Sequence, residues 1–225
     1  LGGLSAMFLF CGYEFVRSPA ESIFMEQFGA EYKPYAIACV PFMMAAMIYA
    51  YGRLLSAIGA KKSMAVTMIG SALFFLFAWA MMGRAGRWLA FLLLVFKESY
   101  VVVISEQYWS FINSVLKDEE GKIFNGPVAG LGALGSLTGG WLIGRYVMGL
   151  GTGAFLLYAS LIIIPAAVLF WIGYDRAGEP VPSADEAGGK KGHLHLSILL
   201  ENRTVLFIAF IIFAAQVVAT ALDFR

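Results

Sequence analysis

Charged side chains interrupt two of the long apolar stretches of this chain, and there they could do chemistry. Glu14, Arg17 and Glu21 lie in the first stretch, at helical positions within about 60° of one another. A charge in the hydrocarbon of a bilayer costs roughly 3 kcal/mol or more, so residues kept there usually face a watery cavity or a partner. The stripe predicts a transport site for an anion or a coupling ion, centred on Arg17. The alternative is a purely structural ion pair between Arg17 and a neighbouring glutamate.

A second charged group, formed by Lys97, Glu98 and Glu106, lies in the fourth apolar stretch. We expect Glu98 to face the same cavity as the first group, and a structural pair between helices is the alternative. Lys97 falls on another face of the helix, and the sequence leaves open whether it reaches the membrane surface or pairs inside a bundle. Tyr108 and Trp109 are expected to be aromatic residues of the membrane interface.

The elements that must carry these charges are transmembrane helices, because 60% of the residues are hydrophobic and only 14% are charged. A soluble domain has about 25% charged residues, so most of this surface is expected to face lipid. About 20 residues cross the hydrocarbon core, and irregular backbone cannot face lipid. The sequence therefore predicts an all-α, polytopic membrane protein. Its predicted helices are 4–28, 34–52, 63–83, 88–114, 126–148, 152–174 and 204–225.

A polar segment rich in Gly and Pro, 175–203, separates the first six predicted helices from the seventh. We therefore expect a six-helix bundle over 1–174, a linker, and the start of a second bundle over 204–225, as in a fragment of a longer protein. Basic residues gather on one side of the predicted bundle and place the linker in the cytoplasm. On the linker side they are Arg53, Lys61, Lys62, Lys117, Lys122, Arg176, Lys190, Lys191 and Arg203, against Lys33, Arg84, Arg87 and Arg145 on the other.

Other kinds of site have little support in the sequence. Cys11 and Cys39 lie in apolar stretches and are expected to be buried thiols, and His193 and His195 lack the ligand neighbours of a metal site. The net charge of +1 gives no basic surface for nucleic acid. We find no nucleophile, base and orienting group together, so we expect no enzyme activity, no cofactor and no metal.

The predicted helix 126–148 carries small residues at four-residue intervals. Small residues so spaced let two helix backbones approach closely. We expect this row to pack directly against a neighbouring helix and to bind no ligand. The row is Gly132, Ser136, Gly140 and Gly144, with Gly135 and Gly139 as a second small pair.

Three segments resemble known transporters. The segment 52–62, GRLLSAIGAKK, resembles the cytoplasmic signature loop of the major facilitator superfamily, with Ser56 in place of its acidic residue. Two longer segments resemble the ATP/ADP translocase family of that superfamily, which comprises nucleotide transporters of plastids, intracellular bacteria and their free-living relatives. They are GAEYKPYAIACVPFMMAAMIYAYGRLLSAIGAKKSM at 29–64 and KESYVVVISEQYWSFINSVLKDEEGKIFNGPVAGLGALGSLTGG at 97–140.

The resemblance implies roles for individual residues. Glu98 stands where the family has an acid in its fourth helix, and Asp223 resembles the acid of its seventh. Arg17 and Glu21 match the pattern of the first helix, whereas Ala20 stands where the family has a lysine. The expected substrate-binding residues are therefore these matched charges together with Glu14, that is, Glu14, Arg17, Glu21, Glu98 and Asp223.

The fold implied is the amino-terminal six-helix half of a twelve-helix major facilitator, followed by helix seven. Such halves are built from inverted repeats around a site at the midplane. The function implied is exchange of ATP and ADP by alternating access across a bacterial inner membrane. A facilitator for another anionic or zwitterionic solute is an alternative, and a membrane scaffold that does not transport is a second one.

Overall fold

Helices form along the apolar stretches in a computed structural model of the protein, which describes residues 1–84, 86–116 and 118–178 and six residues further on. These six are Arg203, Leu206, Phe207, Phe210, Ile211 and Ala214. Of the described residues 94% are helical and none lies in a strand, which confirms the all-α prediction for this part of the chain. The chain divides into two units, Leu1–Val181 and Pro182–Arg225. Asp223, both histidines and most of the predicted linker lie outside the described residues.

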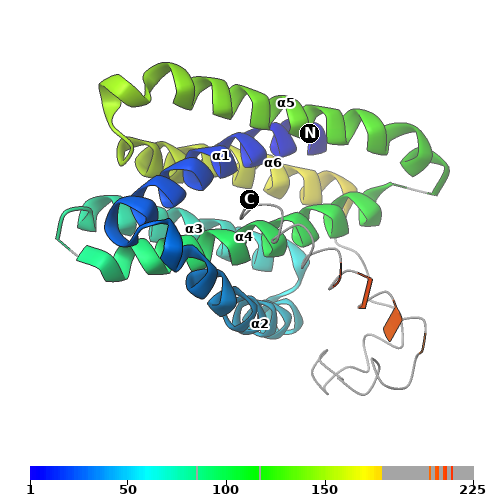
Figure 1. The fold of residues 1–225 in the computed structure, drawn as a ribbon. Coiled ribbons are helices and arrows are strands. Elements are labelled where there is room, and N and C mark those ends of the chain that lie inside the picture. The colour runs from blue at the N-terminus through cyan, green and yellow to red at the C-terminus, as the bar shows by residue number, and fades with distance from the viewer. Residues whose placement is uncertain are drawn as a thin grey trace. The chain divides into compact units, whose positions relative to one another are not determined.

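The first unit contains six long helices joined by short connections (Figure 1). They are α1 (Gly2–Phe28), α2 (Lys33–Ile58), α3 (Ala60–Met81), α4 (Gly86–Val115), α5 (Asp118–Leu150) and α6 (Ala154–Ala177), with a 3-10 turn, η1 (Ala30–Tyr32), before α2. Gly29 and Gly59 follow α1 and α2 with φ of 88° and 80°. Only glycine adopts such angles without strain, so these residues let each helix stop and the chain reverse.

Among the described residues, four helical segments are long and apolar enough to cross a bilayer, namely Ala30–Ile58, Ala60–Met81, Gly86–Val115 and Ala154–Ala177. The shortest has 22 residues and rises about 33 Å, compared with a hydrocarbon core of about 30 Å. Helices α1 and α5 have the necessary length, but the charges of α1 and the many glycines of α5 make them less apolar. The helices as a group fit an integral membrane protein of the all-α class.

Helix α1 lies in the middle of the bundle, where it packs against α5, α6 and α4 (Figure 1). The other main pairings are α3 with α6 and α2 with α4. Burial of α1 is nearly complete along the side that holds Leu9, Val16 and Phe24. A helix with three charges near its middle is thus held in place by apolar contacts on its remaining faces.

Tyr108 belongs to this core and does not lie at the membrane interface. Its side chain is only 1% exposed, and its ring makes edge contacts with Phe10 of α1 and Phe170 of α6. The prediction of an interface aromatic is therefore wrong for Tyr108, because α1 and α6 both cover that side of α4.

The glycines of α5 bring its backbone against α1. A Cβ added to Gly139 would lie 2.8 Å from the carbonyl oxygen of Cys11, and one added to Gly135 would collide with the backbone of Met7. Gly132 similarly lies against an aromatic ring of α1. The close approach expected of small residues therefore occurs on this face.

The row that was predicted to make this contact is wrong at two of its four positions. Nothing lies within 4 Å of a Cβ placed on Gly140 or Gly144, and both residues are exposed. A strict spacing of four residues drifts by about 40° at each step around a helix. The contacting glycines, at 132, 135 and 139, follow spacings of three and four and so stay on one face.

Candidate functional site

The predicted charges of the first and fourth helices meet, and the residue that joins them is Lys97. Its Nζ lies 2.6 Å from Glu98 Oε1 and 3.3 Å from Glu21 Oε1, and its side chain is 1% exposed. Removing an ammonium group from water costs several kcal/mol, so a buried lysine needs carboxylate partners. Lys97 therefore gathers one acid from α1 and one from α4, which explains how two helices hold the predicted site together.

A second lysine, Lys33, connects Glu21 to α2. Lys33 is the first residue of α2, and its Nζ lies 3.6 Å from Glu21 Oε1. The reversal at Gly29 and the short η1 turn bring Lys33 back to the level of Glu21. Because the Glu21 side chain is 37% exposed, this carboxylate serves two lysines and still reaches the surface of the unit.

Glu14 and Arg17 form a separate pair along α1. Arg17 Nη1 lies 3.6 Å from Glu14 Oε1, and the arginine side chain is 54% exposed. An open pair three residues apart on a helix contributes only about 0.3–0.5 kcal/mol. The pair therefore contributes little to stability and does not explain why an arginine is present here. The Arg17 guanidinium faces outward, where a ligand can reach it.

Tyr13 lies among these charges, although the sequence reasoning did not single it out. Its half-buried phenol interacts electrostatically with Glu14, Arg17, Glu21 and Glu98. The signal that could have identified it is the four-residue spacing from Tyr13 through Arg17 to Glu21, which puts all three on one side of α1. Tyr13 provides a hydroxyl that can donate or accept a hydrogen bond near both ion-pair groups.

The six ionised residues that result are called the charge cluster from this point on. They are Glu14, Arg17, Glu21, Lys33, Lys97 and Glu98. Three carboxylates against three cations give a formal charge of zero. Such a cluster can bind a charged solute by exchange of partners, with an anion replacing a glutamate on Lys97 or Arg17, or a cation replacing a lysine on Glu21 or Glu98.

Helix α1 contains a proline in the same layer. Pro19 is inside the helix and buried, so the carbonyl of Phe15 loses its usual helical partner. Ala20, which stands where the resembling family has a lysine, is fully buried. The charges of α1 are therefore next to a proline, where a helix can bend and a carbonyl is freed.

One acid of α4 stays outside the charge cluster. Glu106 lies two turns beyond Glu98 on α4, is exposed, and has no ion pair among the described residues. Asp223 falls outside those residues.

Cys11 is buried and Cys39 half-buried, both as free thiols. Within the described ranges, no three His, Cys, Asp or Glu side chains stand close enough to hold a metal ion.

Comparison of the chain with known protein families, with curated proteins and with solved structures gives no match. Its function is therefore inferred from the charge cluster and from the arrangement of the helices.

Proposed function

We propose that this chain is the six-helix half of a secondary transporter of the major facilitator type, which moves a small charged solute by alternating access. The observation that carries the proposal is the burial of Lys97 in a helix apolar enough to cross a bilayer, with carboxylates from two helices around it. Ionisable residues at such positions are expensive and mark substrate or ion pathways.

The helix packing supports this fold. Facilitator halves contain two inverted three-helix repeats, so exchanging α1, α2 and α3 for α4, α5 and α6 should reproduce the same contacts. The pairing of α1 with α5 has its counterpart in α4 with α2, and that of α1 with α6 has a much smaller counterpart in α4 with α3. The exchange leaves the pairs α1–α4 and α3–α6 unchanged, and the helices of each pair are in contact. The charge cluster thus involves residues of α1 and α4. The inverted repeat exchanges these two helices with each other, and they are in direct contact.

The proposed solute is a nucleotide, exchanged as ATP against ADP across a bacterial inner membrane with the 175–203 linker in the cytoplasm. Lys97 supports this choice. The first helix has Ala20 where the family has a lysine, but Lys97 Nζ lies 3.3 Å from Glu21, the next residue along α1. The cation missing from α1 is therefore supplied by α4. Arg17 would then bind phosphate oxygens through charge-assisted hydrogen bonds, and the buried Lys97 would join it when helix movement uncovers its ammonium group.

The balance of charge favours a second candidate, a zwitterionic solute. A nucleotide has several negative charges, whereas the charge cluster has a formal charge of zero. The ammonium group of such a solute could replace a lysine as the partner of one glutamate, and its carboxylate could replace a glutamate as the partner of one basic residue. The formal charge of the site would then stay at zero.

Uptake by liposomes that contain the protein in its full natural length tests the proposal. Labelled ATP should enter against internal ADP, and excess external ADP should compete with it. Lys97→Gln should reduce uptake per amount of folded protein about tenfold or more, the effect of losing one charge-assisted hydrogen bond, while Glu106→Gln on the same helix should leave it unchanged. Transport of another solute without competition by ADP would reject the nucleotide and keep the transporter. Absence of any transport by folded protein would favour the scaffold.

A further inference from the structure

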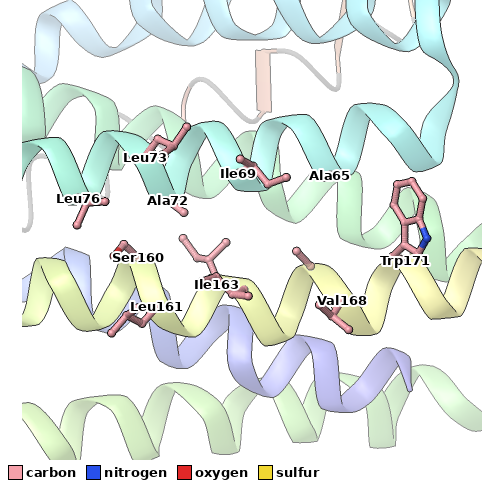
Figure 2. Close-up of a pocket in the computed structure, with 12 residues that line it drawn as sticks. Ala65, Ile69, Ala72, Leu73, Leu76, Ser160, Leu161, Ile163, Val168 and Trp171 are labelled. Carbon is pink, nitrogen blue, oxygen red and sulfur yellow. The ribbon is translucent and has the colours of Figure 1, made fainter.

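An apolar groove of about 510 Å³ runs between α3 and α6. Figure 2 shows its two walls, with Leu76 and Ala72 of α3 across from Ser160 and Ile163 of α6, and with Trp171 at one end. Small side chains, including Ala72, make room for the hollow, and most of the larger ones, such as Leu73 and Trp171, stay exposed while Ile163 is buried. An apolar chain lying in the groove would be held on several sides, unlike lipid on a flat helix face.

The length of the groove equals the depth of one bilayer leaflet. On α3 its lining runs from Ala65 to Leu76, and on α6 from Ser160 to Trp171. Each of these segments rises about 16 Å along its helix. Half of a hydrocarbon core is about 15 Å. The groove therefore matches an acyl chain that extends from the headgroup layer to the midplane.

One end of the groove has the residues of a membrane interface. Lys61, in the first turn of α3, forms an ion pair with Asp175 of α6, and its Nζ lies 3.8 Å from the ring centre of Trp171. Lys62 is exposed, has no ion pair among the described residues, and lies three residues before Ala65 on the same side of α3. Tryptophan and lysine together mark the level of the lipid headgroups.

From these observations we propose that the groove binds an anionic phospholipid. Its phosphate lies at Lys62, and one acyl chain lies between α3 and α6. Lys61, Lys62 and Arg176 against Asp175 give this end a formal charge of +2. Basic residues at the cytoplasmic ends of helices attract anionic headgroups, and a zwitterionic headgroup lacks this attraction. The site does not depend on which solute the protein moves.

Quenching of Trp171 fluorescence by brominated lipids tests the site. The other four tryptophans are replaced by Phe, and the protein is placed in bilayers that mix an unlabelled lipid with brominated phosphatidylglycerol or brominated phosphatidylcholine. Half-maximal quenching should need about fivefold less phosphatidylglycerol than phosphatidylcholine, the effect expected of one lysine close to an anionic headgroup. Lys62→Gln should remove this preference. Lys122→Gln, which removes an exposed lysine at the start of α5, should keep it.

Equal quenching by the two lipids would mean that the groove holds ordinary, non-selective lipid, and would overturn the proposal. A preference that survives Lys62→Gln would overturn it as well, as would a Trp171 that neither lipid quenches because a second copy of the chain covers it. Native mass spectrometry keeps the test decisive if the single-tryptophan protein does not fold. Wild type and Lys122→Gln should retain bound phosphatidylglycerol, and Lys62→Gln should lose it; equal retention by all three would refute the site.

Discussion

Replacing Lys97 with methionine should destabilise the bundle, because two carboxylates lose the cation between them. Methionine keeps a long unbranched side chain and removes the charge. Loss of one member of a buried ion pair costs about 3–5 kcal/mol. The side chains of Glu21 and Glu98 are 37% and 30% exposed, so water can hydrate part of the freed charge. We therefore expect a loss near the lower limit, about 3 kcal/mol in the free energy of unfolding.

A double-mutant cycle with Glu98→Gln isolates the shorter of the two contacts. In the Glu98→Gln background Lys97 retains only Glu21, so Lys97→Met should cost less there than in the wild type. The difference should be about 1.5–3 kcal/mol, the usual contribution of a hydrogen bond between charged groups. The measurement is unfolding in mixed micelles with increasing dodecyl sulfate, followed by far-ultraviolet circular dichroism. Glu106→Gln, at an exposed site on the same helix, should change stability by less than about 0.5 kcal/mol.

Two results would refute this reasoning. If Lys97→Met were as stable as the wild type, the lysine would not be the buried cation between α1 and α4. If the two substitutions were additive, the contact between Lys97 and Glu98 would carry no energy of its own.

Arg17→Ala should abolish uptake and leave the amount of folded protein in the membrane unchanged, because its pair with Glu14 is open; uptake at the wild-type rate in liposomes would rule out Arg17 as the anion anchor. Gly135→Ala should lower the yield of folded protein, since the new methyl group meets the backbone of Met7, whereas Gly140→Ala has free space and serves as the control. Equal monodisperse peaks for the two variants in size-exclusion chromatography would contradict the contact between α5 and α1.

The helices could be predicted from the sequence because length and apolarity suffice to define them. Spacing also placed Glu14, Arg17 and Glu21 on one stripe, and in the structure Glu21 and Glu98 contact the same lysine. The role of Lys97 could not be predicted. Spacing within a helix gives the angle between side chains, but the rotation of one helix against the next depends on how all six pack.

The same limit explains the two errors. Tyr108 has the composition of an interface residue, yet α1 and α6 both cover its side of α4. The contact face of α5 follows Gly135 and Gly139 because α1 lies on that side, while Gly140 points away. In each case the residue type fits two environments, and only the neighbouring helix decides between them.

The zero charge of the charge cluster has a consequence for the electrical behaviour of the protein. Moving one elementary charge across 100 mV takes about 2.3 kcal/mol. If the three glutamates and three basic residues shifted together as α1, α2 and α4 moved in the proposed transport cycle, they would transfer no net charge. Under the proposed function, membrane voltage would therefore act on the solute alone. Exchange of ATP for the less charged ADP would produce a current in a planar bilayer, and exchange of zwitterions would be electrically silent.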